Sequence, residues 1–190
     1  MGMLVTGLLV FFGVHAVPML SGIRAALVAR LGEPFYKGLF SIASLAGFVL
    51  IVPGFSRTPV VPLWLPPPWS HGLALLVMPA AFILLVAAYI PGNIRRITRH
   101  PMLAGIFIWA VAHLIANGDL ASLLLFGTFT IYAVIDMLSA SFRTAAASRP
   151  PGRSDNHSVY MDAITIVVGL ALFLVVWQFH GALFGAALAR

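Results

Sequence analysis

The sequence predicts an all-α integral membrane protein, built as a bundle of about six transmembrane helices. Of its 190 residues, 61% are hydrophobic and only 8% are charged, and the mean hydropathy is +1.03. This composition provides too little polar surface for a water-soluble domain, so the chain must be solvated by a lipid bilayer. Spans in lipid are expected to be helical, because an isolated strand leaves its backbone amides unpaired.

Six apolar runs are long enough to cross hydrocarbon about 30 Å thick, which takes roughly 20 helical residues. They cover about residues 3–21, 38–56, 70–91, 101–117, 120–138 and 163–186. The first run lacks a basic segment before it and is long for a secretion signal, so we expect it to remain as a span. Together the runs predict a single membrane domain over residues 1–190.

Two of the connections predict where helices begin. Pro101 follows a basic segment and suits the first turn of the fourth span. The sequence Asn117-Gly118-Asp119 is a short turn that places spans four and five in an antiparallel hairpin. Asp119 is expected to close this hairpin or to cap the helix that follows.

Two longer connections differ from the others in amino-acid composition. Residues 53–69 are too rich in proline for a helix and carry Trp64 and Trp69, which predicts an extended segment at the outer membrane interface. Residues 143–160 show no periodicity, which predicts a mobile cytoplasmic loop. There is no internal repeat of the kind that many transporters show.

The basic residues predict the orientation of the chain. One side of the membrane receives nine of them: Arg24, Arg30, Lys37, Arg95, Arg96, Arg99, Arg143, Arg149 and Arg153. Only Arg57 and Arg190 fall on the other side. The positive-inside rule therefore predicts a multi-pass protein of the inner (cytoplasmic) membrane with both termini on the non-cytoplasmic side. The same placement accounts for the formal charge of +6 without a nucleic-acid partner.

Ionisable residues at membrane depth are functional candidates, because placing them in lipid is costly. Helix rise puts His15 about 9 Å and His113 about 18 Å from the cytoplasmic end. Neutral imidazole is a common ligand of b-type heme, and an aromatic helix bundle suits the porphyrin. A tilted heme, or a first helix bent at Pro18, would absorb the difference in depth. The alternative is that each imidazole only packs against a neighbouring helix and bonds a backbone carbonyl.

Further residues would complete such a heme site. Trp109 and Asn117 lie on the same helical face as His113, at spacings of four. Propionate groups need cations or hydroxyls, and the candidates on the cytoplasmic side are Arg24, Tyr36, Arg95, Arg96 and Arg99. A basic rim that only sets orientation explains these arginines equally well.

The remaining ionisable residues of the spans receive no heme role. Asp136 is expected to pair with an arginine of the cytoplasmic rim or to reach water. The residues leave open what His71, His100 and His180 do. His100 and His113 are spaced as two stacked hemes would require, but no other span carries a matching pair. No cysteine is present, so iron–sulfur clusters and thiolate ligands are excluded.

Three segments resemble the signature of the NnrU family: RHPMLAG at 99–105, the Trp109-x-x-x-His113 motif, and ANGDLASL at 116–123. The first span with His15 and the segment at 38–44 resemble it as well, so the similarity covers about residues 1–140. The family includes bacterial membrane proteins associated with nitrite and nitric oxide reduction, that is, with denitrification, and the related plant ζ-carotene isomerase.

The resemblance implies the same pair of iron ligands as the helix faces do. In the plant branch, a b-type heme is proposed to lie between histidines that match His15 and His113. A further histidine of that branch falls near Tyr132 here, and the residues after His113 look bacterial. Carotenoid isomerisation is therefore not carried over.

Two functions of different classes follow. The first is a heme b-binding membrane protein, either a redox-gated isomerase acting on an apolar polyene or a redox protein linked to nitric oxide. The second is a non-catalytic membrane factor that supports the assembly or regulation of a nitrite or nitric oxide reductase. Whether the protein is an enzyme is left open.

Overall fold

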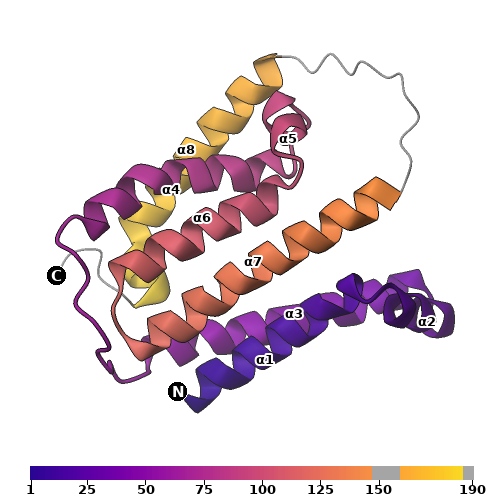
Figure 1. Ribbon diagram of the computed structural model, residues 1–190, viewed down its shortest axis with the longest axis horizontal. Coiled ribbons are helices and arrows are strands. Elements are labelled where there is room, and N and C mark those ends of the chain that lie inside the picture. The colour runs from indigo at the N-terminus through magenta and orange to yellow at the C-terminus, as the bar shows by residue number, and fades with distance from the viewer. Residues whose placement is uncertain (147–158, 186–190) are drawn as a thin grey trace.

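The computed structural model describes residues 1–146 and 159–185, with side chains described up to residue 142 in the first range. Most of these residues are helical (Figure 1). In chain order the helices are α1 (Gly2–Ala16), the 3-10 turn η1 (Val17–Met19), α2 (Ser21–Leu31), α3 (Glu33–Ser56), α4 (Ser70–Ala87), α5 (Asn93–Thr98), α6 (Pro101–Ala116), α7 (Leu120–Ala146) and α8 (Val159–Phe184). Within the described ranges, the only β pairing is an isolated bridge between Pro62 and Asp119.

The predicted all-α membrane bundle is confirmed, with a small difference in the number of long spans. Five helical segments of the described chain are long and apolar enough to cross a membrane: Gly2–Met19, Glu33–Ser56, Ser70–Ala87, Leu120–Phe142 and Val159–Phe184. The sixth, α6, is apolar but has only 16 residues, which is below the roughly 20 that a full crossing requires. It lies between α4 and α7, so much of its surface faces protein.

Glycines bring α1 and α3 into close antiparallel contact (Figure 1). A Cβ atom on Gly7 would lie 2.8 Å from the Ile51 backbone nitrogen, and one on Gly47 would lie 2.7 Å from the Phe11 nitrogen. Small residues at helix contacts allow backbones to approach closely, which is how helices associate where no water drives them together. The α1–α3 pair is therefore a tightly packed unit.

A second unit forms around α4. A Cβ on Gly105 of α6 would lie 2.9 Å from the Ala81 carbonyl oxygen, and one on Gly169 of α8 would lie 2.7 Å from the Ile83 Cα. Helices α6 and α8 thus pack on α4 but make no close backbone contact with each other in the described chain. Helix α7 packs along α6 and also touches α1 and α3, so it joins the two units.

The start of α1 and the end of α8 lie close together, both beside the end of α3. Leu4 of α1 packs at Gly54, near the end of α3, and Gly185 after α8 packs against Ser56 at that same end. The end of α6 lies there too, because the Gly118 carbonyl accepts hydrogen bonds from Leu63 and Trp64 of the loop that follows α3. Helices α6 and α8 therefore end where α1 begins.

The structure corrects several predicted boundaries. Helices α2 and α5 were not predicted, because α2 carries two arginines and α5 is only six residues long. Residues 53–56 were predicted to be extended, but α3 continues through Pro53 to Ser56. Helix α7 extends to 146 and α8 begins at 159, so both ends of the predicted loop 143–160 are helical. The middle of that loop lies outside the described residues.

Candidate ligand cavity

A cavity of about 840 Å³ lies where the two helical units meet. It is lined by α3, α4, α6, α7 and α8, together with the loop that follows α3. Most of the lining is apolar or aromatic, with Phe55, Trp109, Phe126, Phe129 and Trp177 among the rings. Its size and its apolar lining with a few polar groups are typical of sites that bind small organic ligands.

His113 lies on the wall of this cavity with a fixed ring orientation. Its Nδ1 atom is 2.8 Å from the carbonyl oxygen of Trp109, one turn earlier in α6. A carbonyl can only accept, so Nδ1 carries the proton and donates it, and Nε2 keeps its lone pair. Phe126 of α7 packs beside the imidazole at 4.8 Å between ring centroids. This arrangement suits an imidazole that binds a metal through Nε2.

The polar residues of the cavity gather at one end. Thr58 and His71 line it next to Asn117 and Asp119. Asn117 donates a hydrogen bond from its side-chain amide to the His113 carbonyl at 2.8 Å, which satisfies an acceptor at the end of α6. The basic Arg57 lies between two lining residues in the sequence. The cavity is therefore amphipathic, with its polar end where α3 and α6 end.

Helix α8 contributes a third histidine to the cavity, after His113 and His71. The ring of His180 lies 6.4 Å from the ring of His113, centroid to centroid, with 19° between the ring planes. Phe173, Trp177, His180 and Phe184 all line the cavity and are spaced by four, three and four residues, as on one helical face. This spacing is readable in the sequence, but the predicted site did not include His180.

The structure does not bring His15 and His113 together. His15 is one residue from the end of α1, and His113 lies near the opposite end of the bundle. The His15 ring stacks on Phe11 at 4.1 Å and contacts Phe40 and Tyr132, and it does not line the cavity. Phe11 in turn contacts Phe129 at 5.6 Å, so aromatic rings separate His15 from the cavity.

His15 nevertheless shares one feature with His113. Its Nδ1 atom is 2.7 Å from the carbonyl oxygen of Phe11, again one turn earlier. Both imidazoles therefore keep Nε2 free of the proton and hold the ring against their own helix. This is the backbone contact that the packing alternative predicted, and it is also the contact that orients a metal ligand.

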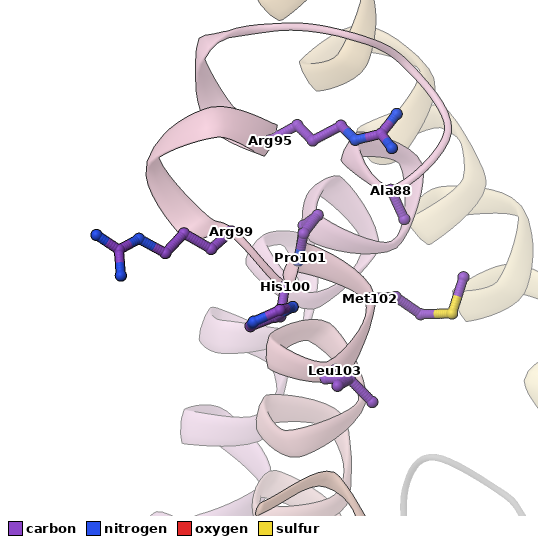
Figure 2. A pocket seen from close by; sticks show the side chains of 7 residues that line it. All are labelled: Ala88, Arg95, Arg99, His100, Pro101, Met102 and Leu103. Carbon is purple, nitrogen blue, oxygen red and sulfur yellow. The ribbon is translucent and has the colours of Figure 1, made fainter. Parts of the chain in front are cut away.

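The predicted propionate partners lie away from this cavity. None of Arg24, Tyr36, Arg95, Arg96 and Arg99 lines it. Arg95 and Arg99 instead border a separate pocket of about 250 Å³ beside His100, and Figure 2 shows their side chains extending in opposite directions. Tyr36 is buried near Phe40, and its hydroxyl has no hydrogen-bond partner among the residues that the structure describes. A propionate role for these residues stays a prediction.

The two aspartates discussed from the sequence have defined surroundings. Asp119 caps α7 as predicted, since its carboxylate accepts hydrogen bonds from the Ser122 amide at 3.0 Å and from the Ser122 hydroxyl at 2.6 Å. Asp136 accepts a hydrogen bond from Tyr132 at 3.3 Å. Within the described ranges, no group of three or more His, Cys, Asp or Glu side chains is placed to hold a metal ion.

The fold and the cavity define a class: a multi-pass, all-α membrane protein whose helices enclose an apolar cavity with two facing imidazoles. The family model described as "NnrU protein" matches residues 3–188, which is nearly the whole chain. The chain belongs to the NnrU family. No significant match was found among curated proteins or among solved structures.

Proposed function

We propose that this NnrU-family chain is a heme b-binding membrane protein and that His113 supplies an iron ligand from the wall of the cavity. The observation that carries the proposal is an imidazole with a fixed tautomer facing an apolar, aromatic space of about 840 Å³. A porphyrin needs such a space, because its large apolar ring is stabilised by aromatic and aliphatic contacts.

The residues of the cavity fit the group in three respects. His113 presents Nε2 with its lone pair, because Nδ1 donates to the Trp109 carbonyl. Trp109, Phe126 and Phe129 supply apolar ring surface. The polar end, with Thr58, His71 and Asn117 near Arg57, suits acidic side groups, which need hydrogen-bond donors and positive charge.

A bound heme would supply an iron whose oxidation state governs how it is ligated. The chain's own contribution is to exclude water with the aromatic lining, to hold the His113 ring through the Trp109 carbonyl, and to keep polar groups at one end. A cavity inside a lipid-embedded bundle favours a small apolar substrate, a class that includes nitric oxide and polyenes. The proposal therefore covers a redox protein linked to nitric oxide and an isomerase of apolar chains.

A visible spectrum of protein purified from cells supplied with a heme precursor tests the proposal. We expect a Soret band that is lost, or largely lost, in His113→Ala and in Ala116→Phe, which fills part of the cavity. His100→Ala is the matched control, because His100 lies at the other end of α6 beside the separate pocket and should leave the band unchanged. A colourless wild-type protein would refute heme binding and favour the non-catalytic assembly or regulatory factor.

A further inference from the structure

His113 and His180 lie on helices whose backbones do not come close to each other. Helices α6 and α8 both pack on α4, but their backbones make no close contact in the described chain. His113 and His180 nevertheless reach to within 6.4 Å of each other, centroid to centroid, across the space between the helices. The two imidazole rings therefore bring α6 and α8 into side-chain contact across the cavity.

The depth of the two rings agrees. His113 lies three residues before the end of α6, and His180 lies four residues before the end of α8. Both helices end at the same end of the bundle, where α3 also ends. The two imidazoles therefore face each other at nearly the same level, which His15, near the end of α1, does not share.

The separation matches what two ligands of one metal ion require. A metal–imidazole bond is about 2 Å long and the ring centroid lies roughly 1 Å further out, so two opposite imidazoles have centroids about 6 to 6.5 Å apart. The observed 6.4 Å falls in this range, and 19° separates the two ring planes.

We propose that His180 of α8 is the second iron ligand, opposite His113, so that the cavity is a bis-histidine site. This inference rests on the proposed heme function and names its second ligand, which differs from the pair that the sequence predicts. His15 then belongs to the packing between α1, α3 and α7, where its neighbours are Phe11, Phe40 and Tyr132.

Optical and electron paramagnetic resonance spectra of the heme-loaded protein test the assignment without any activity measurement. We expect wild-type protein to show a six-coordinate, low-spin spectrum. His180→Gly should lose it and become high-spin, and added imidazole should restore the low-spin spectrum by entering the vacated space. Restoration would show that the variant is folded and that only the ligand was missing.

Two matched variants separate this inference from the proposed function. His15→Ala should keep the low-spin spectrum, and so should His100→Ala, which removes a histidine that does not line the cavity. If His180→Gly keeps the wild-type spectrum while His15→Ala becomes high-spin, His180 is not the ligand, although heme binding stands. If the wild-type protein binds no heme at all, both proposals fail.

Discussion

A single carbonyl oxygen determines the chemistry that His113 can perform. The Trp109 carbonyl accepts a hydrogen bond from the protonated Nδ1 of His113 at 2.8 Å, so the unprotonated Nε2 can act as a base or as a metal ligand. The same contact restrains the ring, since the imidazole cannot rotate without breaking a hydrogen bond in a medium that offers no replacement. The helix itself thus prepares this side chain for binding before any ligand arrives.

At the residue scale, Asp162 is expected to be important for stability. It lies in the first turn of α8, and its carboxylate accepts hydrogen bonds from the Ile94 amide at 3.0 Å and from Asn93 at 2.7 Å. Asp162→Ala leaves these donors of α5 without that acceptor and should lower the free energy of unfolding by about 1–3 kcal/mol. Thermal denaturation in detergent would measure the loss.

The control for this prediction is the exposed ion pair of α3. Glu33 and Lys37 are 2.8 Å apart, but both side chains are more than half exposed. Glu33→Gln should change stability very little, because water screens such pairs. Equal losses in Asp162→Ala and Glu33→Gln would contradict the special role of Asp162.

The sequence predicted part of the candidate site, and the reason for the missing part is geometric. His113, Trp109 and Asn117 were placed on one helical face, and all three line the cavity. His180 was not included, because periodicity does not say which face of α8 is turned toward the cavity. The depth of His180 in the membrane could be predicted, since the last helix runs in the same direction as α6. The rotation of α8 about its own axis could not, because the packing of the whole bundle sets it.

At the scale of helices, glycine contacts hold the bundle together. In α1, Gly7 faces α3 so closely that a Cβ would lie 2.8 Å from the Ile51 nitrogen, whereas Gly13 has nothing within 4 Å. Two glycines of one helix therefore have opposite surroundings, and they provide an internal comparison.

We predict that Gly7→Ala lowers the free energy of unfolding by about 1–3 kcal/mol, because the added methyl group collides with backbone that cannot move aside. Gly13→Ala should be neutral or stabilising by up to about 1 kcal/mol, since alanine favours helix more than glycine does. Denaturation of both variants in the same detergent would decide. A stable Gly7→Ala and a destabilised Gly13→Ala would show that α1 packs against α3 through Gly13 and not through Gly7.

The element boundaries show what local sequence can and cannot predict. Apolar runs located every span, because lipid demands about the same length of helix each time. Pro53 misled the prediction at the end of α3, since the proline lies in the last turn and the helix ends only three residues later. Helix α6 has only 16 residues, which is short for a span. It packs between α4 and α7, so less of its surface faces lipid than in the other spans.

At the scale of the whole molecule, the basic residues predict which end faces the cytoplasm. Lys37 and Arg96 are exposed near one end of the bundle, and Arg57 is exposed near the other. The positive-inside rule predicts that Lys37 and Arg96 face the cytoplasm. Because the chain has no cysteine, single cysteines can report each position without background labelling.

A membrane-impermeant maleimide applied outside intact cells should label Arg57→Cys and should not label Lys37→Cys or Arg96→Cys. All three should react after the membrane is opened, which confirms that each thiol is accessible. The reverse pattern on intact cells would invert the orientation and place both termini in the cytoplasm.

The division of the bundle into two glycine-packed units has a mechanical consequence. Units with backbones this close move as rigid bodies, because interiors packed at high density resist internal deformation. Relative tilting of the α1–α3 pair against the helices around α4, which α7 connects, would widen the cavity between them without unwinding any helix. A guest molecule dissolved among the acyl chains would then enter sideways and never need to pass through water.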